Sequence, residues 1–198
     1  MRALPDEQPA LLPAEARLVE PAKAWAASFV DALVEGFRRG NRPPATVREV
    51  RLAQRDFDRF LQARRDQTAM MVLPNGNRVR PVPFSLHWLV AGRVFVGELS
   101  FRHELNAHLR LSGGHIGYGI RPSLWGQGFG KRLLALGLDQ AAAHGLERAL
   151  LTCHDGNARS AAVIEANGGV LEDVIDDVFG GGPLRRYWID LEGRTCRA

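Results

Sequence analysis

Apolar residues in the first third of the chain recur at helical spacing. Residues 22–38 place large apolar side chains four positions apart, which gathers them on one face of a helix. These side chains are Trp25, Phe29, Leu33 and Phe37. A second helical pattern runs over 47–65, after a Gly- and Pro-containing break at 40–44. Two roles stay open for the apolar faces of both predicted helices: they pack in the core, or they form the wall of a pocket for an acceptor.

From residue 85 onward, short apolar runs of strand length replace the helical spacing. Together with a short first strand at 17–20, they predict strands over 85–90, 94–102, 116–120, 148–153, 170–175 and 186–191. Ala91 and Gly92 predict a hairpin between the first two of these runs. A further turn is expected over 74–77, where Pro, Asn and Gly cluster.

Two helical runs interrupt the strands, one over 131–144 that Gly145 ends and one over 157–166. One helix joins the strands 116–120 and 148–153, so we expect them to pair in parallel with a right-handed crossover. The sequence therefore predicts an α+β fold. It has a mixed, mostly antiparallel twisted sheet, helices on both faces and a central parallel β-α-β crossover.

Glycines gather between the predicted strand 116–120 and the helix that follows it, in the run Gly126-Gln127-Gly128-Phe129-Gly130-Lys131. Glycine lacks a Cβ atom and accepts positive φ angles, so an anion can approach the main chain closely. A helix start adds unpaired N–H groups and the positive end of the helix dipole. A phosphate or diphosphate site is therefore the first functional hypothesis, and a plain tight turn is the alternative.

The glycine spacing argues against two common phosphate-binding loops. A dinucleotide fingerprint, G-x-G-x-x-G, would need its third glycine where Lys131 stands. A Walker A loop, G-x-x-x-x-G-K-[ST], would need a glycine at Trp125 and a hydroxyl residue at Arg132. The pattern that remains is G-x-G-x-G-K between a strand and a helix.

Three segments resemble the acyl-CoA-binding core of the GNAT superfamily of N-acetyltransferases: Gly114–Pro122, Trp125–Lys131 and Asn157–Gly169. The positions that match the family pattern are Gly128, Gly130, Asn157, Ser160, Glu165 and Gly168. Trp125 stands where Gln or Arg is usual, and Ile164 stands where Tyr is frequent. The run Arg102–Asn106 upstream of these segments resembles an uncharacterised bacterial branch of predicted acetyltransferases.

The resemblance implies one GNAT-like domain over 1–198. Its acyl-CoA-binding core lies over 94–175, acceptor-side helices lie within 17–80, and residues 1–14 are loosely ordered. The implied activity is acetyl-CoA-dependent transfer of an acetyl group directly to an amine of a small molecule or peptide. Two alternatives stay open, a non-catalytic acyl-CoA sensor and a protein that binds another phosphate ligand such as a nucleotide.

The resemblance also implies which residues hold acetyl-CoA. The strand before the loop pairs with the pantetheine arm in this family, and the loop binds the diphosphate. The implied cofactor-binding residues are Tyr118, Gly119, Ile120, Trp125, Gly126, Gln127, Gly128, Phe129, Gly130, Lys131, Arg132, Asn157 and Ser160. For Asn157 a helix N-cap is an equal alternative. A backbone N–H between residues 118 and 120 is expected to stabilise the oxyanion that develops during acyl transfer.

Acyl transfer to an amine needs a base, because an amine with a pKa of about 10.4 is mostly protonated at neutral pH. The candidates are His115, Glu98 and His103, and the alternative for each is an exposed residue without a role. Ile164 cannot donate a proton, so Tyr187 or water is the candidate acid. A polar cluster after the strand 94–102 is expected to bind the acceptor, and its members are Arg102, His103 and Asn106.

Composition narrows the remaining classes of function. The chain has 198 residues, 45% hydrophobic content and a net charge of +4. No run approaches the roughly 18 apolar residues of a membrane span, and the basic clusters are short and mixed with acids. We therefore expect no membrane or nucleic-acid partner. The two cysteines give no disulfide framework, so we expect a cytoplasmic protein. Two cysteines give no zinc spacing, so we expect no metal. An exposed final strand would permit a homodimer.

Overall fold

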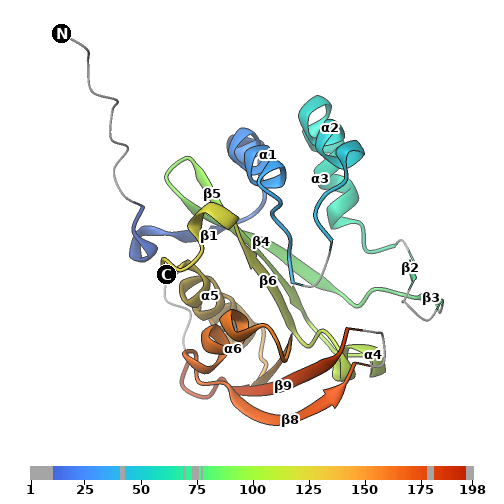
Figure 1. The fold of residues 1–198 in the computed structure, drawn as a ribbon, viewed down its shortest axis with the longest axis vertical. Helices are drawn as coiled ribbons and strands as arrows, with labels where there is room; N and C mark the ends of the chain where they lie inside the picture. Colours follow the sequence, from blue (N-terminus) through green and yellow to red (C-terminus); the bar gives the residue numbers. More distant parts are fainter. Residues whose placement is uncertain are drawn as a thin grey trace.

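The computed structural model describes residues 11–40, 43–68, 70–72, 76, 78–177 and 181–194. Its strands form two main sheets (Figure 1). The first has the order β1 (Arg17–Val19), β4 (Phe84–Ala91), β5 (Val94–Arg102), β6 (Ile116–Ile120). The second has the order β7 (Arg148–His154), β9 (Pro183–Asp190), β8 (Val170–Asp176), and the short β2 (Met71–Val72) pairs with β3 (Arg78–Val79).

Helices connect and cover the sheets. The α-helices are α1 (Ala26–Val34), α2 (Val47–Arg55), α3 (Phe57–Arg65), α4 (Ala107–Leu111), α5 (Phe129–Ala143) and α6 (Ala158–Glu165). Short 3-10 turns occur at η1 (Pro13–Glu15), η2 (Lys23–Trp25) and η3 (Pro122–Leu124). The first residues of η1 fall in the segment expected to be loosely ordered, of which residues 1–10 lie outside the described part of the chain.

Each face of the first sheet has its own hydrophobic core. On one face, Phe29 of α1 stacks on Trp88 of β4 with ring centroids 4.6 Å apart, and Phe95 of β5 packs edge-on against both. On the other face, Leu133 and other apolar residues of α5 pack against β5. Figure 1 shows α1–α3 and α5–α6 on different sides of β4 and β5. The expected helices on both faces are therefore confirmed.

The two sheets meet at the start of β6. The backbone N–H of His115 donates to the carbonyl oxygen of Leu150 in β7 at 2.7 Å. Among the described residues, every strand ladder is antiparallel and none joins β6 to β7. The mostly antiparallel α+β fold is therefore confirmed, and the central parallel crossover stays a prediction.

The helical pattern over 47–65 divides into α2 and α3 at Asp56. Asp56 has φ −147° and ψ 79°, outside the helical region, and its carboxylate accepts the Arg59 N–H at the start of α3. At the start of α2, Thr46 and Glu49 form a capping box. Two short helices therefore replace one continuous run and wrap the aromatic core.

Several boundaries differ from the sequence-based expectations. Helix α1 ends at Val34, although Phe37 beyond it is still buried, and α4 has no counterpart among the predicted helices. The turn over 74–77 lies outside the described residues except for Gly76. The final strand is not an exposed edge, because β9 lies between β7 and β8. The basis given for a homodimer was therefore wrong.

Candidate functional site

Two glycines of the loop between β6 and α5 adopt left-handed backbone conformations. Gly126 has φ +79°, and Gly128, the N-cap of α5, has φ +86°. Side chains other than glycine are strained at such angles. Gly130 has another role, because a Cβ atom there would lie 3.2 Å from the Val163 side chain of α6. The glycine pattern therefore shapes the turn and allows α5 to pack closely on α6.

A row of backbone donors follows from this shape. Among the described residues, the N–H groups from Gly126 to Lys131 find no hydrogen-bond acceptor. Gly128 offers no capping side chain, and the first backbone bond at the helix start runs from the Arg132 N–H to the Gly128 oxygen at 3.3 Å. Residues 125–128 are exposed. The loop therefore presents donors that an anion in solvent can reach.

The charges around the loop also favour an anion. Neither α5 nor α6 has an acidic residue in its first turn, where acids are usually preferred. Lys131 lies in the first turn of α5, and Arg159 lies in the first turn of α6. Neither side chain pairs with a carboxylate in the part of the chain that the structure describes.

Most side chains of the predicted cofactor loop are buried or already hydrogen-bonded within the protein. Phe129 is fully buried, so its backbone N–H is the group available to a ligand. The Gln127 amide donates to the Ser123 oxygen at 3.1 Å, and the Arg132 Nε donates to the Ala16 oxygen at 3.4 Å. The main chain, rather than these side chains, forms the candidate cradle.

Strand β6 presents alternate backbone groups on its free side. The Arg121 N–H donates to the Val96 oxygen next to β5. Hydrogen-bonding groups alternate along an antiparallel strand, so the N–H of Gly119 also points toward β5. The N–H groups of Tyr118 and Ile120 point away from β5. The Tyr118 oxygen accepts the Gly40 N–H at 2.9 Å. The segment that follows α1 therefore covers part of this side of β6, while the N–H groups of Tyr118 and Ile120 find no acceptor among the described residues.

The segment that follows α1, residues 35–40, crosses β6 at Gly119. A Cβ atom on Gly119 would clash with the backbone oxygen of Arg38. The segment is fastened by Glu35, which accepts from the Arg121 guanidinium at 2.5 Å and from the Ser123 hydroxyl at 2.9 Å. The hydrogen bond with Arg121 lowers the pKa of Glu35 despite some burial. This segment forms a fixed wall beside the strand.

Asn157 and Ser160 both have structural partners. The Asn157 Oδ1 accepts the Ser160 N–H at 3.1 Å, so Asn157 is the N-cap of α6. The Ser160 Oγ lies 3.0 Å from the Tyr118 hydroxyl. Burial raises the pKa of Tyr118, against the effect of the Ser160 hydrogen bond. The N-cap alternative is thus observed, and cofactor contacts by these side chains stay a prediction.

Glu98 lies in a buried ion cluster. Its carboxylate contacts Arg64 at 2.5 Å, Arg39 at 3.2 Å and the Trp88 Nε1 at 3.0 Å. Burial alone would raise the pKa of Glu98, but the charges of the two arginines outweigh it and lower the pKa. The alternative of an exposed residue without a role is wrong. A low pKa and full engagement also make this carboxylate a poor proton acceptor.

His115 and Tyr187, two further catalytic candidates, are buried as well. The His115 Nδ1 accepts the Leu150 N–H at 2.9 Å. Burial, and then the charges of nearby arginines, lower its pKa to about 4. The Tyr187 hydroxyl donates to the Glu165 carboxylate at 2.9 Å, and burial raises the pKa of Tyr187. Both contacts are structural, so their catalytic roles stay predictions.

The predicted acceptor cluster does not converge on one point. Arg102 donates to the backbone oxygens of Gly113 and Gly114 at 3.0 and 2.7 Å. His103 contacts the Ser85 hydroxyl and stacks on a second histidine, His144, which caps the C-terminus of α5. Asn106 is the N-cap of α4, where its Oδ1 accepts the Leu109 N–H at 2.9 Å. Each residue has a local structural task.

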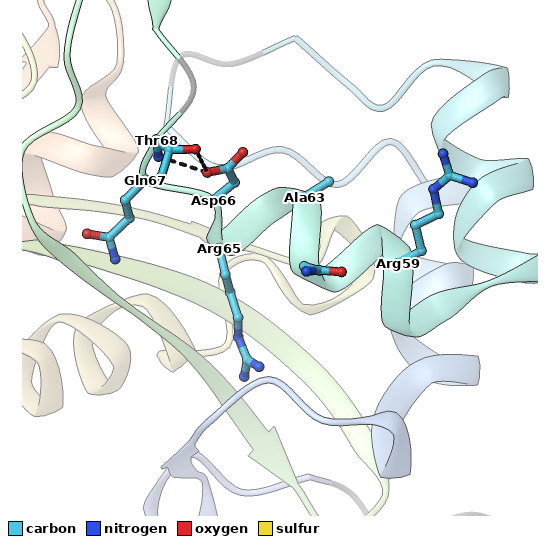
Figure 2. A pocket seen from close by; sticks show the side chains of 7 residues that line it. Arg59, Ala63, Arg65, Asp66, Gln67 and Thr68 are labelled. Atoms are coloured by element: carbon cyan, nitrogen blue, oxygen red, sulfur yellow. Dashed lines mark hydrogen bonds between the residues drawn. The ribbon is translucent and has the colours of Figure 1, made fainter.

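A hollow lies elsewhere, at the C-terminal end of α3 (Figure 2). It has a volume of about 610 Å³, and its lining includes Arg59, Arg65, Asp66 and Thr68. Figure 2 shows Arg59 and Arg65 pointing in different directions, and Asp66 is bonded to Thr68. It shares no residue with the glycine loop, and its side chains do not converge on a ligand.

Sequence reasoning missed the contact between Trp125 and Arg159. The guanidinium lies 5.0 Å from the centre of the indole ring. The position of Arg159 just after Asn157 was the available signal, because it places a cation in the first turn of a helix. In the part of the chain that the structure describes, no helix is long and apolar enough to cross a membrane, and no group of three or more His, Cys, Asp or Glu is placed to hold a metal.

The chain is similar to proteins of known fold. A family model described as "Acetyltransferase (GNAT) domain" matches residues 45–170. The structure of RimJ from Mycobacterium smegmatis in complex with CoA-disulfide has a TM-score of 0.64 and 20% identity, covering 91% of this chain and 84% of that one. The ribosomal-protein-S5-alanine acetyltransferase from Vibrio fischeri has a TM-score of 0.61 and 14% identity, covering 91% and 96%.

A putative acetyltransferase from Salmonella typhimurium, YncA, with its cofactor acetyl-CoA, has a TM-score of 0.53 and 15% identity, covering 90% of this chain and 95% of that one. No curated protein matches the chain in sequence. At these identities the solved structures show the fold alone. The family model, however, matches well over half of the chain, so the protein belongs to the GNAT acetyltransferase family.

Proposed function

We propose that this GNAT acetyltransferase transfers the acetyl group of acetyl-CoA directly to an amine of a small molecule or peptide. The observation that carries the proposal is the row of backbone N–H groups from Gly126 to Lys131 without acceptors among the described residues. Such a row at a helix N-terminus suits a diphosphate. Acetyl-CoA, when bound, supplies the acetyl group and the anionic diphosphate that this cradle fits.

The same proposal assigns a task to the free side of β6. The N–H groups of Tyr118 and Ile120 point away from β5, and they would bind the pantetheine arm and the thioester carbonyl. A gap between β6 and β7, in a parallel arrangement, would admit that arm. Hydrogen bonds fixed in advance and aimed at the carbonyl oxygen stabilise developing negative charge.

The acceptor side would be walled by the segment that crosses β6 at Gly119. Glu98 fastens this side through Arg39 and Arg64, and it does not act as the base. Removal of the amine proton is left to water or to the half-buried His103. The rate is expected to rise as pH approaches the pKa of the acceptor, about 10.4 for a lysine-type amine and about 8 for a peptide α-amine. The S5-alanine acetyltransferase among the similar structures is named for a protein substrate, which makes peptide amines a natural first panel.

A specific observation favours a second candidate, a non-catalytic acyl-CoA sensor. Three of the four predicted catalytic side chains are buried and engaged in structural contacts: Glu98, His115 and Tyr187. The fourth, His103, is half-buried, and its Nε2 lies 2.7 Å from the Ser85 hydroxyl. Ile164, at the position where the family frequently has Tyr, is fully buried too. A sensor needs the cradle but no proton-transfer groups.

A free-thiol release assay separates the two functions. Acetyl-CoA binding is first measured by calorimetry, and CoA thiol release is then followed across a panel of amines and N-terminal peptides. Binding with amine-dependent thiol release supports the enzyme, whereas binding without release from any amine supports the sensor. The absence of any binding heat would overturn both.

A further inference from the structure

An exposed tryptophan and an arginine form a fixed pair at the edge of the glycine loop. Trp125 is 46% exposed, and its Nε1 donates to the Ile120 oxygen at 2.8 Å, which fixes the indole against the end of β6. Arg159, from the first turn of α6, places its guanidinium 5.0 Å from the centre of that ring. The pair therefore connects the residue before the glycine loop to the first turn of α6.

Stacking leaves the guanidinium donors available. A guanidinium over an indole uses its face, whereas its N–H groups lie in its plane and can still form a bidentate pair with phosphate. Other arginines of the chain use these donors on carboxylates, as Arg121 does with Glu35 and Arg186 does with Asp173. Among the described residues, Arg159 has no carboxylate partner.

We propose that Arg159, held by Trp125, binds the 3′-phosphate of the CoA ribose and so selects CoA over dephospho-CoA. The inference rests on the proposed function, in which the loop N–H groups take the diphosphate. CoA carries one more phosphate, a monoester dianion on the nucleotide beyond the diphosphate. An exposed cation that stacks on Trp125 at the edge of the loop, with no internal counter-charge among the described residues, is suited to that group.

The test compares two ligands with two proteins by titration calorimetry. Wild-type protein is expected to bind CoA about tenfold more tightly than dephospho-CoA, as one charge-assisted phosphate contact predicts. Arg159→Gln is expected to lose about tenfold in affinity for CoA while its affinity for dephospho-CoA stays within about twofold. Trp125→Leu, which removes the stacking surface, is expected to lose part of the same selectivity.

A second arginine that stacks on a tryptophan provides a matched control for Arg159→Gln. Arg148 lies 4.6 Å from the ring centre of Trp188, away from the loop. Arg148→Gln removes the same charge and the same kind of stack, and it is expected to keep the tenfold preference for CoA. Melting temperatures of all variants show whether each is folded.

Two results would overturn the inference while leaving the proposed function intact. One is a wild-type protein that binds CoA and dephospho-CoA equally well. The other is an equal loss of both ligands in Arg159→Gln, which would place the arginine on the diphosphate or in a purely structural role. A wild-type protein that binds neither ligand would overturn the proposed function itself.

Discussion

The buried carboxylate of Glu98 provides the sharpest test of how the acceptor side is held together. Glu98 is fully buried, and the side chain of Arg39 beside it is 9% exposed. In Glu98→Gln the shape is kept and the charge is lost, so two guanidinium groups lose their buried counter-charge. Breaking a buried ion pair from one side costs about 3–5 kcal/mol.

We expect a loss at the lower end, about 3 kcal/mol, because Arg64 is partly exposed and can turn toward water. For a domain of this size that corresponds to a fall in melting temperature of roughly 6–12 °C. Urea unfolding followed by tryptophan fluorescence measures the loss directly. The matched control is Glu172→Gln, which removes an exposed partner of Arg186 at 3.4 Å and is expected to change the free energy of unfolding by less than about 0.5 kcal/mol.

The refuting result is a variant with unchanged stability and a large loss of rate. If Glu98→Gln unfolds at the wild-type urea concentration while kcat falls about a hundredfold or more, the carboxylate is a general base after all. A loss of stability, together with a higher KM for the acceptor and a kcat that stays within about tenfold, supports a fastening role.

Three further predictions concern the loop and the other two buried candidates. Gly128→Asp adds a side chain at φ +86° and a negative charge in the cradle, so calorimetry should show at least a hundredfold loss of acetyl-CoA affinity. Gly145→Asp, at φ +92° beyond the other end of α5, carries the same strain and charge and should bind normally. Tyr187→Phe should cost about 1 kcal/mol in urea unfolding, from the lost hydrogen bond to Glu165, and leave thiol release unchanged within about twofold; a rate loss above tenfold would contradict this. Because the pKa of His115 is lowered to about 4 in the folded protein, folding favours its neutral form, and stability should fall by about 2 kcal/mol as pH falls from 7.5 to 5. His115→Gln should remove that part of the pH slope, and an unchanged slope would refute the assignment.

The glycine loop was predictable from the sequence because its signals are local. A strand-like run, closely spaced glycines and a helical run occupy one short stretch, and each has a direct backbone consequence. The structure adds that Gly126 and Gly128 are needed for positive φ angles, whereas Gly130 is needed for packing on α6. The three small positions have different physical causes that spacing alone does not separate.

The division of the helical pattern into α2 and α3 at Asp56 was harder to predict, because the residues around Asp56 are compatible with one continuous helix. Apolar residues continue at near-helical spacing on both sides of it, and aspartate inside a helical pattern is compatible with an exposed position. Its carboxylate instead caps the next helix. Capping competes with continuation of the helix, and the outcome depends on the aromatic core that both helices cover.

The catalytic candidates show where sequence reasoning reaches its limit. A carboxylate in a strand is exposed, paired or functional, and the sequence does not reveal which. Arg64 lies 34 positions before Glu98 and reaches it only because α3 folds back over the sheet. The long-range backbone bond that engages the His115 ring from Leu150 was equally invisible. Composition and spacing identify residue types, whereas the partners that set a pKa come from the tertiary fold.

The central claim is that main-chain amides of the glycine loop bind acetyl-CoA, and amide NMR tests it most directly. In a 15N-labelled sample, the resonances of Gly126, Gly128, Gly130 and Lys131 are expected to move on addition of acetyl-CoA, with downfield proton shifts typical of hydrogen bonds to phosphate. The amide of Gly145, beyond the other end of α5, is expected to stay in place. Saturating acetyl-CoA that leaves the loop amides unmoved would contradict the claim.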